Sequence, residues 1–397
     1  MVAGGAAATG GSSSTATSCT INSSPYASGQ ADPNNPCQSC QPAMSSTDWS
    51  NVPTSSCVVP AIAAGTDNTC ALVHGGVECW GANNSGQLGN NSTQNSSVPV
   101  QVVGLTTGVT AVSSNCAVVN GGVQCWGYNF DGQLGNNSTS RSSVPVQVVG
   151  LTTSVTAVSS GCAVVNGGVQ CWGSNGSGEL GNNSTNNSSV PVQVADLTSG
   201  ATTVSSGSYH SCAVVNGGVR CWGRNGSGQL GNNSTNNSSV PVQVADLTSG
   251  ATAVSCGFDY SCAVVNGSVQ CWGVNYYHQL GNNSTNNSST PVQVAGLTSG
   301  VTAIATGDQH SCAVVNGSVQ CWGVNYYGQL GNNSTNNSST PVQAVGLTSD
   351  ATAISCGQSH SCAVVNGGVQ CWGHNFDGRL GNNSTVDSSV PVMVQIL

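Results

Sequence analysis

The sequence contains no lysine and few charges of either sign. Only 4% of its 397 residues are charged, and four arginines stand against 13 acidic residues, giving a formal net charge of -9. Binding to a phosphate backbone needs clustered cations, so this composition argues against a nucleic-acid partner. No apolar run approaches the roughly 20 residues that cross a bilayer, so we expect no membrane span.

The start of the chain also lacks the pattern of a secretory leader. Residues 1–18, MVAGGAAATGGSSSTATS, have neither a basic beginning nor an apolar centre. We therefore expect either that a leader was removed ahead of this numbering or that the chain is a fragment. The composition predicts a flexible Gly/Ala/Ser/Thr tract over residues 1–18.

Cysteine, in contrast, is abundant and regularly spaced. There are 20 cysteines, and most occur as pairs whose members lie nine positions apart. Zinc sites usually use closer CxxC pairs, and no histidine recurs regularly between the cysteines of these pairs. We therefore expect disulfides, no metal ion and no cofactor. Disulfides in turn favour an extracellular or cell-surface location.

One motif sets the period of the chain. The stretch CAVVNGGVQC occurs seven times with small changes, and successive copies start 46, 46, 50, 50, 50 and 50 residues apart. Each period holds four short alternating runs, for example ATTVS at 201–205, SCAVV at 211–215, GVRCW at 218–222 and VPVQV at 240–244. The sequence therefore predicts an all-β fold, a seven-bladed β-propeller with four-stranded blades over residues 58–397.

The motif also predicts how its two cysteines lie. Asn120-Gly121 is a favoured two-residue hairpin turn, and counting outward from it places Cys116 opposite Cys125 on neighbouring strands. Directly opposite residues of a non-hydrogen-bonded pair have Cα atoms about 4.5 Å apart, which a disulfide tolerates. One hairpin disulfide per blade is expected: Cys70–Cys79, Cys116–Cys125, Cys162–Cys171, Cys212–Cys221, Cys262–Cys271, Cys312–Cys321 and Cys362–Cys371.

Six cysteines fall outside these pairs. Cys256 and Cys356 occupy equivalent positions in blades 5 and 7. The sequence leaves three interpretations open for them: buried free thiols, a bridge to each other, or links to another chain. The other four, Cys19, Cys37, Cys40 and Cys57, predict a small module stapled by two disulfides over residues 19–57, with three possible pairings. A redox role for Cys37 and Cys40 is the alternative, although no βαβ pattern surrounds them.

With these motifs in place, the chain resembles the RCC1 (regulator of chromosome condensation) repeat family. Residues 204–231, VSSGSYHSCAVVNGGVRCWGRNGSGQLG, are similar to its repeat in both the GxxHS and the WGxNxxGQLG steps, and so are ATGDQHSC and SCGQSHSC in blades 6 and 7. The resemblance covers about residues 57–397 and implies a seven-bladed propeller. Family members include a nuclear nucleotide-exchange factor, a plant ultraviolet photoreceptor and secreted bacterial inhibitors of β-lactamase, so the resemblance does not fix an activity.

The histidines and tryptophans of the repeat are expected to be structural. His210, His310 and His360 keep the GxxHS histidine, but blade 5 has Tyr260 and blade 1 has Asn68 instead. A catalytic or metal-binding role would not tolerate such variation around the ring. The tryptophan after each second cysteine is expected to pack between neighbouring blades, because it brings the large apolar area that the sequence otherwise lacks.

The loops that follow Trp-Gly differ most between blades and supply candidate binding residues. Such loops gather on one face of a propeller, and aromatic side chains on a rigid scaffold are suited to binding a protein or a glycan. The alternative is that they cover seams between blades. The candidates are Tyr128, Phe130, Arg224, Tyr276, Tyr277, Tyr326, Tyr327 and Phe376.

The Asn/Ser-rich stretch after each of these loops carries Asn-x-Ser/Thr acceptor patterns. These same residues also suit turns, so glycosylation is one of two interpretations. The candidate acceptors are Asn91, Asn137, Asn183, Asn233, Asn283, Asn333 and Asn383.

Groups for catalysis are scarce, because Glu78 and Glu179 are the only glutamates and no catalytic triad or paired carboxylates recur. We therefore expect a secreted or cell-surface, non-enzymatic binding scaffold that recognises a protein or glycan through one face. A structural subunit of an extracellular filament or coat, built from copies of the chain, is the first alternative. A guanine-nucleotide exchange factor is a remote one.

Overall fold

The structure of the chain is a computed structural model. It describes residues 18–21, 24–27, 31–32, 35–39, 50–51 and 59–396. The chain divides into two compact units, one formed by Met1–Cys57 with Leu397 and the other by Val58–Ile396. Among the described residues there is no helix long and apolar enough to cross a membrane.

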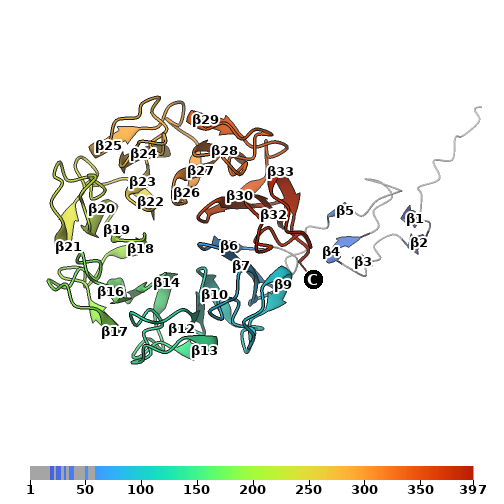
Figure 1. Ribbon diagram of the computed structural model, residues 1–397, viewed down its shortest axis with the longest axis horizontal. Coiled ribbons are helices and arrows are strands. Elements are labelled where there is room, and N and C mark those ends of the chain that lie inside the picture. The colour runs from blue at the N-terminus through green and yellow to red at the C-terminus, as the bar shows by residue number, and fades with distance from the viewer. Residues whose placement is uncertain are drawn as a thin grey trace, which may run out of the picture. The chain divides into compact units, whose positions relative to one another are not determined.

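The second unit is a ring of seven four-stranded sheets, and each sheet is a meander of consecutive strands (Figure 1). The predicted all-β, seven-bladed propeller with four-stranded blades is confirmed. Blades 1 to 3 are β6 (Ala61–Ala64), β7 (Asn68–Val73), β8 (Gly76–Gly81), β9 (Ser96–Gln101); β10 (Val109–Val112), β11 (Cys116–Val119), β12 (Gly122–Gly127), β13 (Ser142–Gln147); and β14 (Val155–Ser159), β15 (Cys162–Val165), β16 (Gly168–Gly173), β17 (Ser188–Gln193).

Blades 4 to 7 follow the same plan. They are β18 (Ala201–Ser206), β19 (His210–Val215), β20 (Gly218–Gly223), β21 (Ser238–Gln243); β22 (Ala251–Cys256), β23 (Tyr260–Val265), β24 (Ser268–Gly273), β25 (Ser288–Gln293); β26 (Val301–Thr306), β27 (His310–Val315), β28 (Ser318–Gly323), β29 (Ser338–Gln343); and β30 (Ala351–Cys356), β31 (His360–Val365), β32 (Gly368–Gly373), β33 (Ser388–Met393). The first strand of each blade lines the centre of the ring and the fourth lies at its periphery (Figure 1).

The ring closes without exchange of a strand between the first and last blades, because each blade is built from its own four consecutive strands. The join is made by packing: Val59, Ile62 and Trp80 of the first part of the ring share one buried cluster with Val369 and Leu380 of blade 7. A backbone hydrogen bond of 3.1 Å from Val59 N to Gly367 O adds to it. Burial of apolar surface therefore closes the ring.

The seven hairpin disulfides form as predicted. In blade 2, Cys116 pairs with Cys125 and Val119 with Gly122, while Asn120 and Gly121 at the turn have φ angles of 50° and 81°. Both angles are in the left-handed region that this tight turn requires. The bridged Cα atoms are 4.0 to 4.1 Å apart in all seven blades, slightly closer than the 4.5 Å expected from the ladder alone.

The two short repeats lose residues at one place. In blades 2 and 3 the second strand begins at the cysteine, as in β11 and β15, whereas in blade 4 β19 begins two residues earlier at His210. The missing residues belong to the connection between the first and second strands and to the start of the second. The hairpin and its disulfide are therefore unaffected.

In the first unit, β1 (Ser18–Ile21) pairs with β2 (Ser24–Ala27), and β3 (Ala31–Asp32), β4 (Asn35–Ser39) and β5 (Ser50–Asn51) form a second small sheet. The predicted flexible tract over 1–18 lies, except for Ser18, outside the described residues. The same holds for the side chains of Cys19, Cys37, Cys40 and Cys57, so the stapled module over 19–57 remains a prediction.

Candidate binding face

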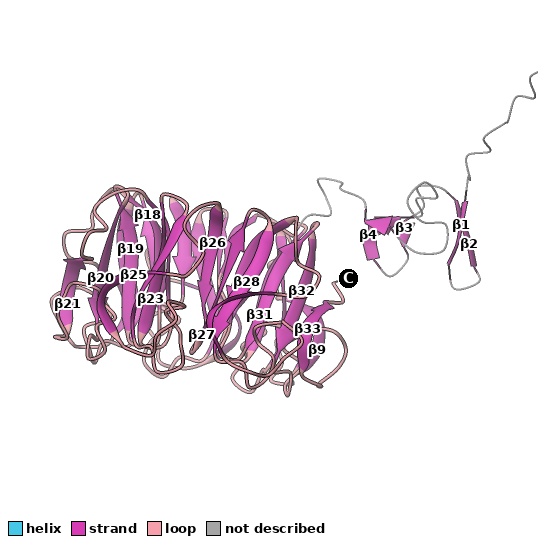
Figure 2. Cartoon of the chain, turned by 90° about the horizontal axis from the view of Figure 1, so that it is seen from above, coloured by secondary structure: helices cyan, strands magenta, loops and turns pink. Residues whose placement is uncertain are grey.

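The topology of the blades brings two sets of loops to one face. In a four-stranded meander the connections after the first and third strands lie at one end, and those after the second and fourth lie at the other. Figure 2 shows the strands running between two loop-covered ends. The loops after Trp-Gly therefore share a face with the loops between the first and second strands. We call this face the Trp-Gly face.

A buried asparagine fixes the shape of each Trp-Gly loop. In blade 6, the Asn325 side chain is fully buried, and its Nδ2 donates to Ser334 O at 2.9 Å and Asn336 O at 3.0 Å. Its Oδ1 accepts a hydrogen bond of 2.9 Å from the N–H of Leu330. Buried donors and acceptors that are all satisfied make a loop rigid, so these loops form a fixed surface. The equivalents are Asn83, Asn129, Asn175, Asn225, Asn275 and Asn375.

The tryptophans lie in the seams between blades, as predicted. Trp322 of blade 6 is fully buried in one cluster with Cys262, Cys271 and Leu280 of blade 5. Its indole N–H donates a hydrogen bond of 2.8 Å to the backbone oxygen of Gln279 in the preceding loop. The same bond recurs in all seven seams, from Trp80, Trp126, Trp172, Trp222, Trp272, Trp322 and Trp372.

The GxxHS histidines link the same seams. His310 Nε2 lies 2.9 Å from Ser361 Oγ of the next blade, and Ser361 donates to Gln329 O at 2.9 Å. The pKa values of His210 and His310 are lowered to about 4 because burial disfavours the charged ring. A Cβ added at Gly307 would lie 2.6 Å from Cε1 of His310, which explains the glycine three residues before the histidine.

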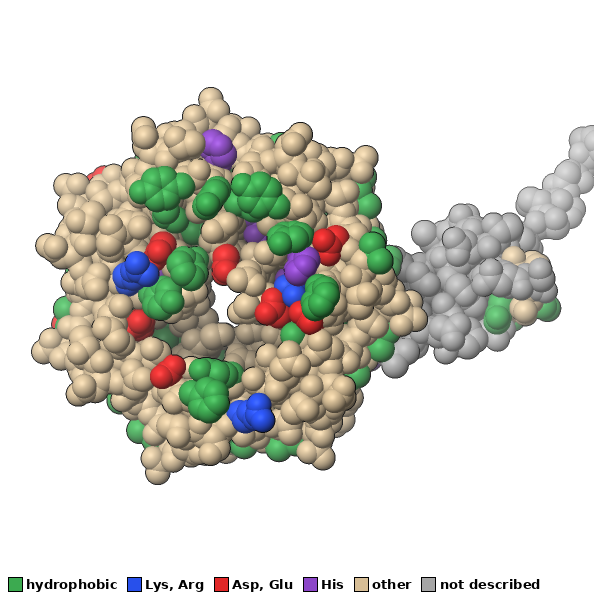
Figure 3. All heavy atoms as spheres, viewed as in Figure 1, with side chains coloured by type: hydrophobic (Ala, Val, Ile, Leu, Met, Phe, Trp, Pro, Cys, Tyr) green, Lys and Arg blue, Asp and Glu red, His purple; other side chains and the backbone are tan. Residues whose placement is uncertain are grey.

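The candidate aromatic side chains are exposed. Phe376 is 75% exposed, Tyr276 69% and Phe130 67%, so these side chains do not fill the seams, which the tryptophans occupy. Tyr128 and Phe130 contact each other edge to face with centroids 4.9 Å apart, and Tyr327 lies 4.3 Å from the ring of His374. Figure 3 shows one face of the propeller, with hydrophobic side chains in separate groups around the central opening.

Sequence reasoning missed two aromatic residues of this face. Tyr209 and Phe258 are each 39% exposed and contact each other at 5.4 Å between ring centroids. They belong to the connections between the first and second strands, whereas all the predicted candidates lie in the Trp-Gly loops. The predicted candidate Arg224 lies beside this pair. Its guanidinium is 5.2 Å from the centroid of the Tyr209 ring and 3.8 Å from the Asp259 carboxylate.

The second arginine of this face has a different role. Arg379 is buried, and it binds Asp67 at 2.7 Å and Asp377 at 2.8 Å. It stands where five of the other blades have glutamine and blade 3 has Glu179, and it joins blade 7 to blade 1. Its charge is therefore compensated, whereas Arg224 leaves its side chain 43% exposed on the face.

Two hollows open among the loops of this face. One, of about 290 Å³, is lined by Asp308, Tyr326, Tyr327 and His374 among others. Burial raises the pKa of the Asp308 carboxyl. The other, of about 220 Å³, lies at the shortened connections of blades 2 and 3 and is lined by Trp172 and Glu179, among others.

The centre of the ring is a channel with a mainly polar lining. Its cavity of about 420 Å³ is lined mainly by Ser, Ala, Gly and Thr from the seven first strands and the connections after them. Cys256 and Cys356 also line it. Both are buried and free in the structure, so the two do not form a bridge to each other. Burial raises the pKa of each thiol to about 12.

The candidate glycosylation asparagines are exposed in every blade and adopt positive φ angles between 57° and 60°. Their backbone N–H groups donate across the seam to a serine of the next blade, for example from Asn333 to Ser389 O at 2.9 Å. These residues therefore have a structural role as turns in the loop. The structure leaves their side-chain amides accessible.

Comparison with solved structures shows the same fold elsewhere. Prp20p of Saccharomyces cerevisiae shares 19% identity over 85% of this chain and 88% of its own, with a TM-score of 0.68. The yeast RCC1 (Prp20) in complex with Kap60 shares 18% identity over 87% of this chain and 89% of its own, with a TM-score of 0.68. Human WBSCR16 shares 21% identity over 92% of this chain and 88% of its own, with a TM-score of 0.64. Comparison with curated protein sequences gives no match.

Family models agree with this fold. The regulator of chromosome condensation (RCC1) repeat matches residues 74–116, and the RCC1-like domain matches residues 114–397, which is more than half of the chain. The chain therefore belongs to the RCC1-like domain family.

Proposed function

We propose that the protein is a non-enzymatic scaffold that binds a macromolecule, most directly another protein, through the Trp-Gly face. The observation that carries the proposal is the set of exposed aromatic side chains on loops whose backbones are fixed by buried asparagines. Tyrosine and phenylalanine bury large areas on binding at a small entropic cost, and pre-shaped loops lower that cost further.

The charges of the face fit a partner with cationic groups. Its loops contribute the acidic residues Asp67, Asp131, Glu179, Asp259, Asp308, Asp377 and Asp387, against Arg141, Arg224 and Arg379. The Arg379 charge is compensated within the protein. Lysine and arginine side chains of a partner would therefore be attracted to the face and could stack on its rings.

Relatives in the family support a binding role. The yeast Prp20p structure is described together with its binding to Gsp1p and histones, and Prp20 has been seen bound to Kap60. At 18–19% identity these structures support the fold, and the partner of this chain is a separate question.

The proposed location is extracellular or at the cell surface. Seven hairpin disulfides support it, because such bonds persist in oxidising compartments. In a host with N-linked glycosylation, the exposed acceptors Asn91, Asn137, Asn183, Asn233, Asn283, Asn333 and Asn383 would carry glycans. A loss of mass on treatment with an N-glycosidase tests this, and an unchanged mass from such a host rejects it.

The binding proposal is tested with arrays of secreted and surface proteins and, in parallel, of glycans. The face variant carries Tyr276→Ser and Tyr326→Ser. The matched control carries Val149→Ser and Val345→Ser, which are 45% and 47% exposed in loops at the opposite end. We expect ligands whose binding falls at least tenfold in the face variant and is unchanged in the control. Binding that only the control weakens, or no ligand on either array, rejects the proposal; signals on the glycan array alone reject a protein partner.

A further inference from the structure

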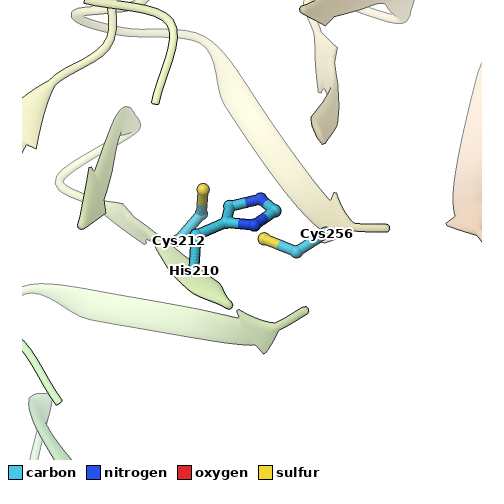
Figure 4. Close-up of side chains that lie close together, drawn as sticks. All are labelled: His210, Cys212 and Cys256. Carbon is cyan, nitrogen blue, oxygen red and sulfur yellow. The ribbon is translucent and has the colours of Figure 1, made fainter. Parts of the chain in front are cut away.

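Both unpaired cysteines of the propeller lie beside a histidine of the preceding blade. Cys256 of blade 5 lies beside His210 of blade 4, and Cys356 of blade 7 lies beside His310 of blade 6. In each group the ligand atoms of the histidine, the free cysteine and one hairpin cysteine are within 4.8 Å of one another. Figure 4 shows the first group, with the sulfur of Cys256 directed toward the imidazole ring of His210.

The hairpin cysteine of each group is not available as a thiolate. Cys212 is bonded to Cys221, and Cys312 to Cys321. A disulfide sulfur is a weak ligand, because the thiolate is the form of cysteine that binds metal ions. Each group therefore offers two strong metal ligands, one imidazole nitrogen and one thiol sulfur.

Hydrogen bonds fix which imidazole nitrogen is free. Ser261 Oγ lies 2.7 Å from His210 Nε2 and donates its only proton to Gln229 O at 3.1 Å. With this proton donated to the Gln229 carbonyl, Ser261 accepts from the Nε2–H of His210, and in that tautomer Nδ1 carries a lone pair. This Nδ1 is buried and has no hydrogen-bond partner, and the same holds for Nδ1 of His310, whose Nε2 is bound to Ser361.

An imidazole held through its second nitrogen is the usual arrangement of a metal-binding histidine. With bonds of about 2.0 Å to nitrogen and about 2.3 Å to sulfur, a metal ion placed in line between the two donors separates them by about 4.3 Å. That separation is compatible with the 4.8 Å limit found here. Two-coordinate geometry and a thiolate ligand select soft ions such as Cu(I).

Charge selects among the soft ions. A monovalent ion, a thiolate and a neutral imidazole sum to zero net charge, whereas a divalent ion would leave a buried, uncompensated positive charge. We propose that the seams between blades 4 and 5 and between blades 6 and 7 hold two binding sites for a soft monovalent metal ion, Cu(I) or Ag(I), each formed by one histidine Nδ1 and one cysteine Sγ.

The central channel supplies the route to both sites. Cys256 and Cys356 line its cavity, and each is 7% exposed there. On binding, the thiol S–H bond breaks and an S–metal bond forms while the metal ion keeps its oxidation state. The released proton leaves to solvent through the same polar channel, so no oxidant or reductant takes part.

The first test counts Ag(I) ions bound to the full chain by native mass spectrometry in chloride-free buffer. We expect the wild type to bind two more ions than the Cys256→Ser/Cys356→Ser variant, and each single variant to bind one more than the double variant. Cysteines elsewhere in the chain are the same in all four proteins and cancel in the difference. With His210→Gln and His310→Gln, both thiols remain and Ag(I) binding should weaken at least tenfold.

The chain offers a matched gain-of-site experiment. Ala64 of blade 1 occupies the position that Cys256 has in blade 5. The neighbouring blade in the ring is blade 7, whose His360 also has a buried, unpartnered Nδ1. Ala64→Cys should therefore add a third Ag(I). Thr306 occupies the same position in blade 6, but the preceding blade, blade 5, has Tyr260 in place of the histidine. Thr306→Cys should add a thiol without a comparable site.

Several results would overturn the proposal. Equal Ag(I) counts for the wild type and the double cysteine variant would show that the thiols bind nothing. Equal affinity in the histidine variants would show that the imidazoles are not ligands. A bridge between Cys256 and Cys212 in the protein as isolated would also exclude the site, because no free thiol would remain. Circular dichroism of each variant confirms that the propeller is folded.

Discussion

The indole of Trp322 donates a hydrogen bond of 2.8 Å to the backbone oxygen of Gln279, one blade earlier in the chain. Ser311 donates to the same oxygen at 3.3 Å, so this carbonyl joins two groups of blade 6 to blade 5. The bond forms in each of the seven seams, although the residue that supplies the oxygen is Gln, Glu or Arg. A backbone acceptor makes the seam independent of that side chain.

Replacement of this tryptophan should destabilise the propeller, and by more when alanine replaces it than when phenylalanine does. Trp322→Phe keeps most of the buried apolar surface and removes the N–H donor, so we expect a loss of about 1–2 kcal/mol in the free energy of unfolding. Trp322→Ala also leaves a cavity and should cost about 3–5 kcal/mol. Denaturant unfolding measures both. Tyr326→Ala, an exposed neighbour, should change stability by less than about 0.5 kcal/mol.

The buried asparagine of each Trp-Gly loop should tolerate no charge. In Asn325→Asp, a carboxylate oxygen replaces the amide that donates to Asn332, Ser334 and Asn336. The result is a buried charge facing three acceptor oxygens, and we expect a loss of about 3 kcal/mol or more. Hydrogen exchange over residues 326–337 should rise. The exposed neighbour Asn333, changed to Asp, should leave both measurements nearly unchanged.

Much of the fold could be predicted from local patterns. The Asn120-Gly121 turn determined the register that places Cys116 opposite Cys125, because the side-chain period of a strand leaves no freedom once the turn is set. The seam position of the tryptophans followed from their size. Their shared backbone acceptor could not be predicted, because it depends on how one blade is rotated against the next.

Loss of one hairpin disulfide should lower stability without changing the fold. The bridge between Cys116 and Cys125 closes a short loop, and the entropy of closing such a loop contributes about 3 kcal/mol. The Cys116→Ala/Cys125→Ala variant should unfold at a correspondingly lower denaturant concentration. Reductant should destabilise the wild type more than this variant. Equal sensitivity of the two proteins to reductant would show that this bridge contributes nothing.

Glu78 should make the protein less stable at neutral and alkaline pH than at acidic pH. It is half-buried, its Oε2 has no partner, and burial raises its pKa from 4.5 to about 7. The folded state therefore holds the proton more tightly than the unfolded chain, and stability falls as pH rises from about 4.5 to about 7. After allowance for partial exposure, Glu78→Gln should stabilise the protein by about 1–2 kcal/mol at pH above 7.

Urea unfolding at acidic, neutral and alkaline pH tests this. Five other blades carry glutamine at the equivalent position, namely Gln124, Gln170, Gln270, Gln320 and Gln370, so the substitution fits the fold. The advantage of the variant should disappear below the usual pKa of glutamate. An advantage that does not change with pH would assign the effect to packing rather than ionisation.

The candidate sites could be predicted less completely than the fold. The Trp-Gly loops were identified because they vary between blades. Tyr209 and Phe258 were missed because they lie in a different connection, and only the stacking of blade 5 on blade 4 brings their rings together. The pairing of Cys256 with His210 was also missed. Within the sequence they lie 46 positions apart, and only the stacking of blade 5 on blade 4 brings them together.

The cysteines offer the most direct test of the proposed structure. The seven hairpin disulfides and the two free thiols, Cys256 and Cys356, follow from the same blade geometry. The measurement is disulfide mapping by mass spectrometry, with alkylation of the protein purified and unfolded without reductant. Within residues 59–396, alkylation is predicted at Cys256 and Cys356 alone, with seven bridges that each join cysteines nine positions apart. Alkylated hairpin cysteines, or bridges that join different blades, would contradict it.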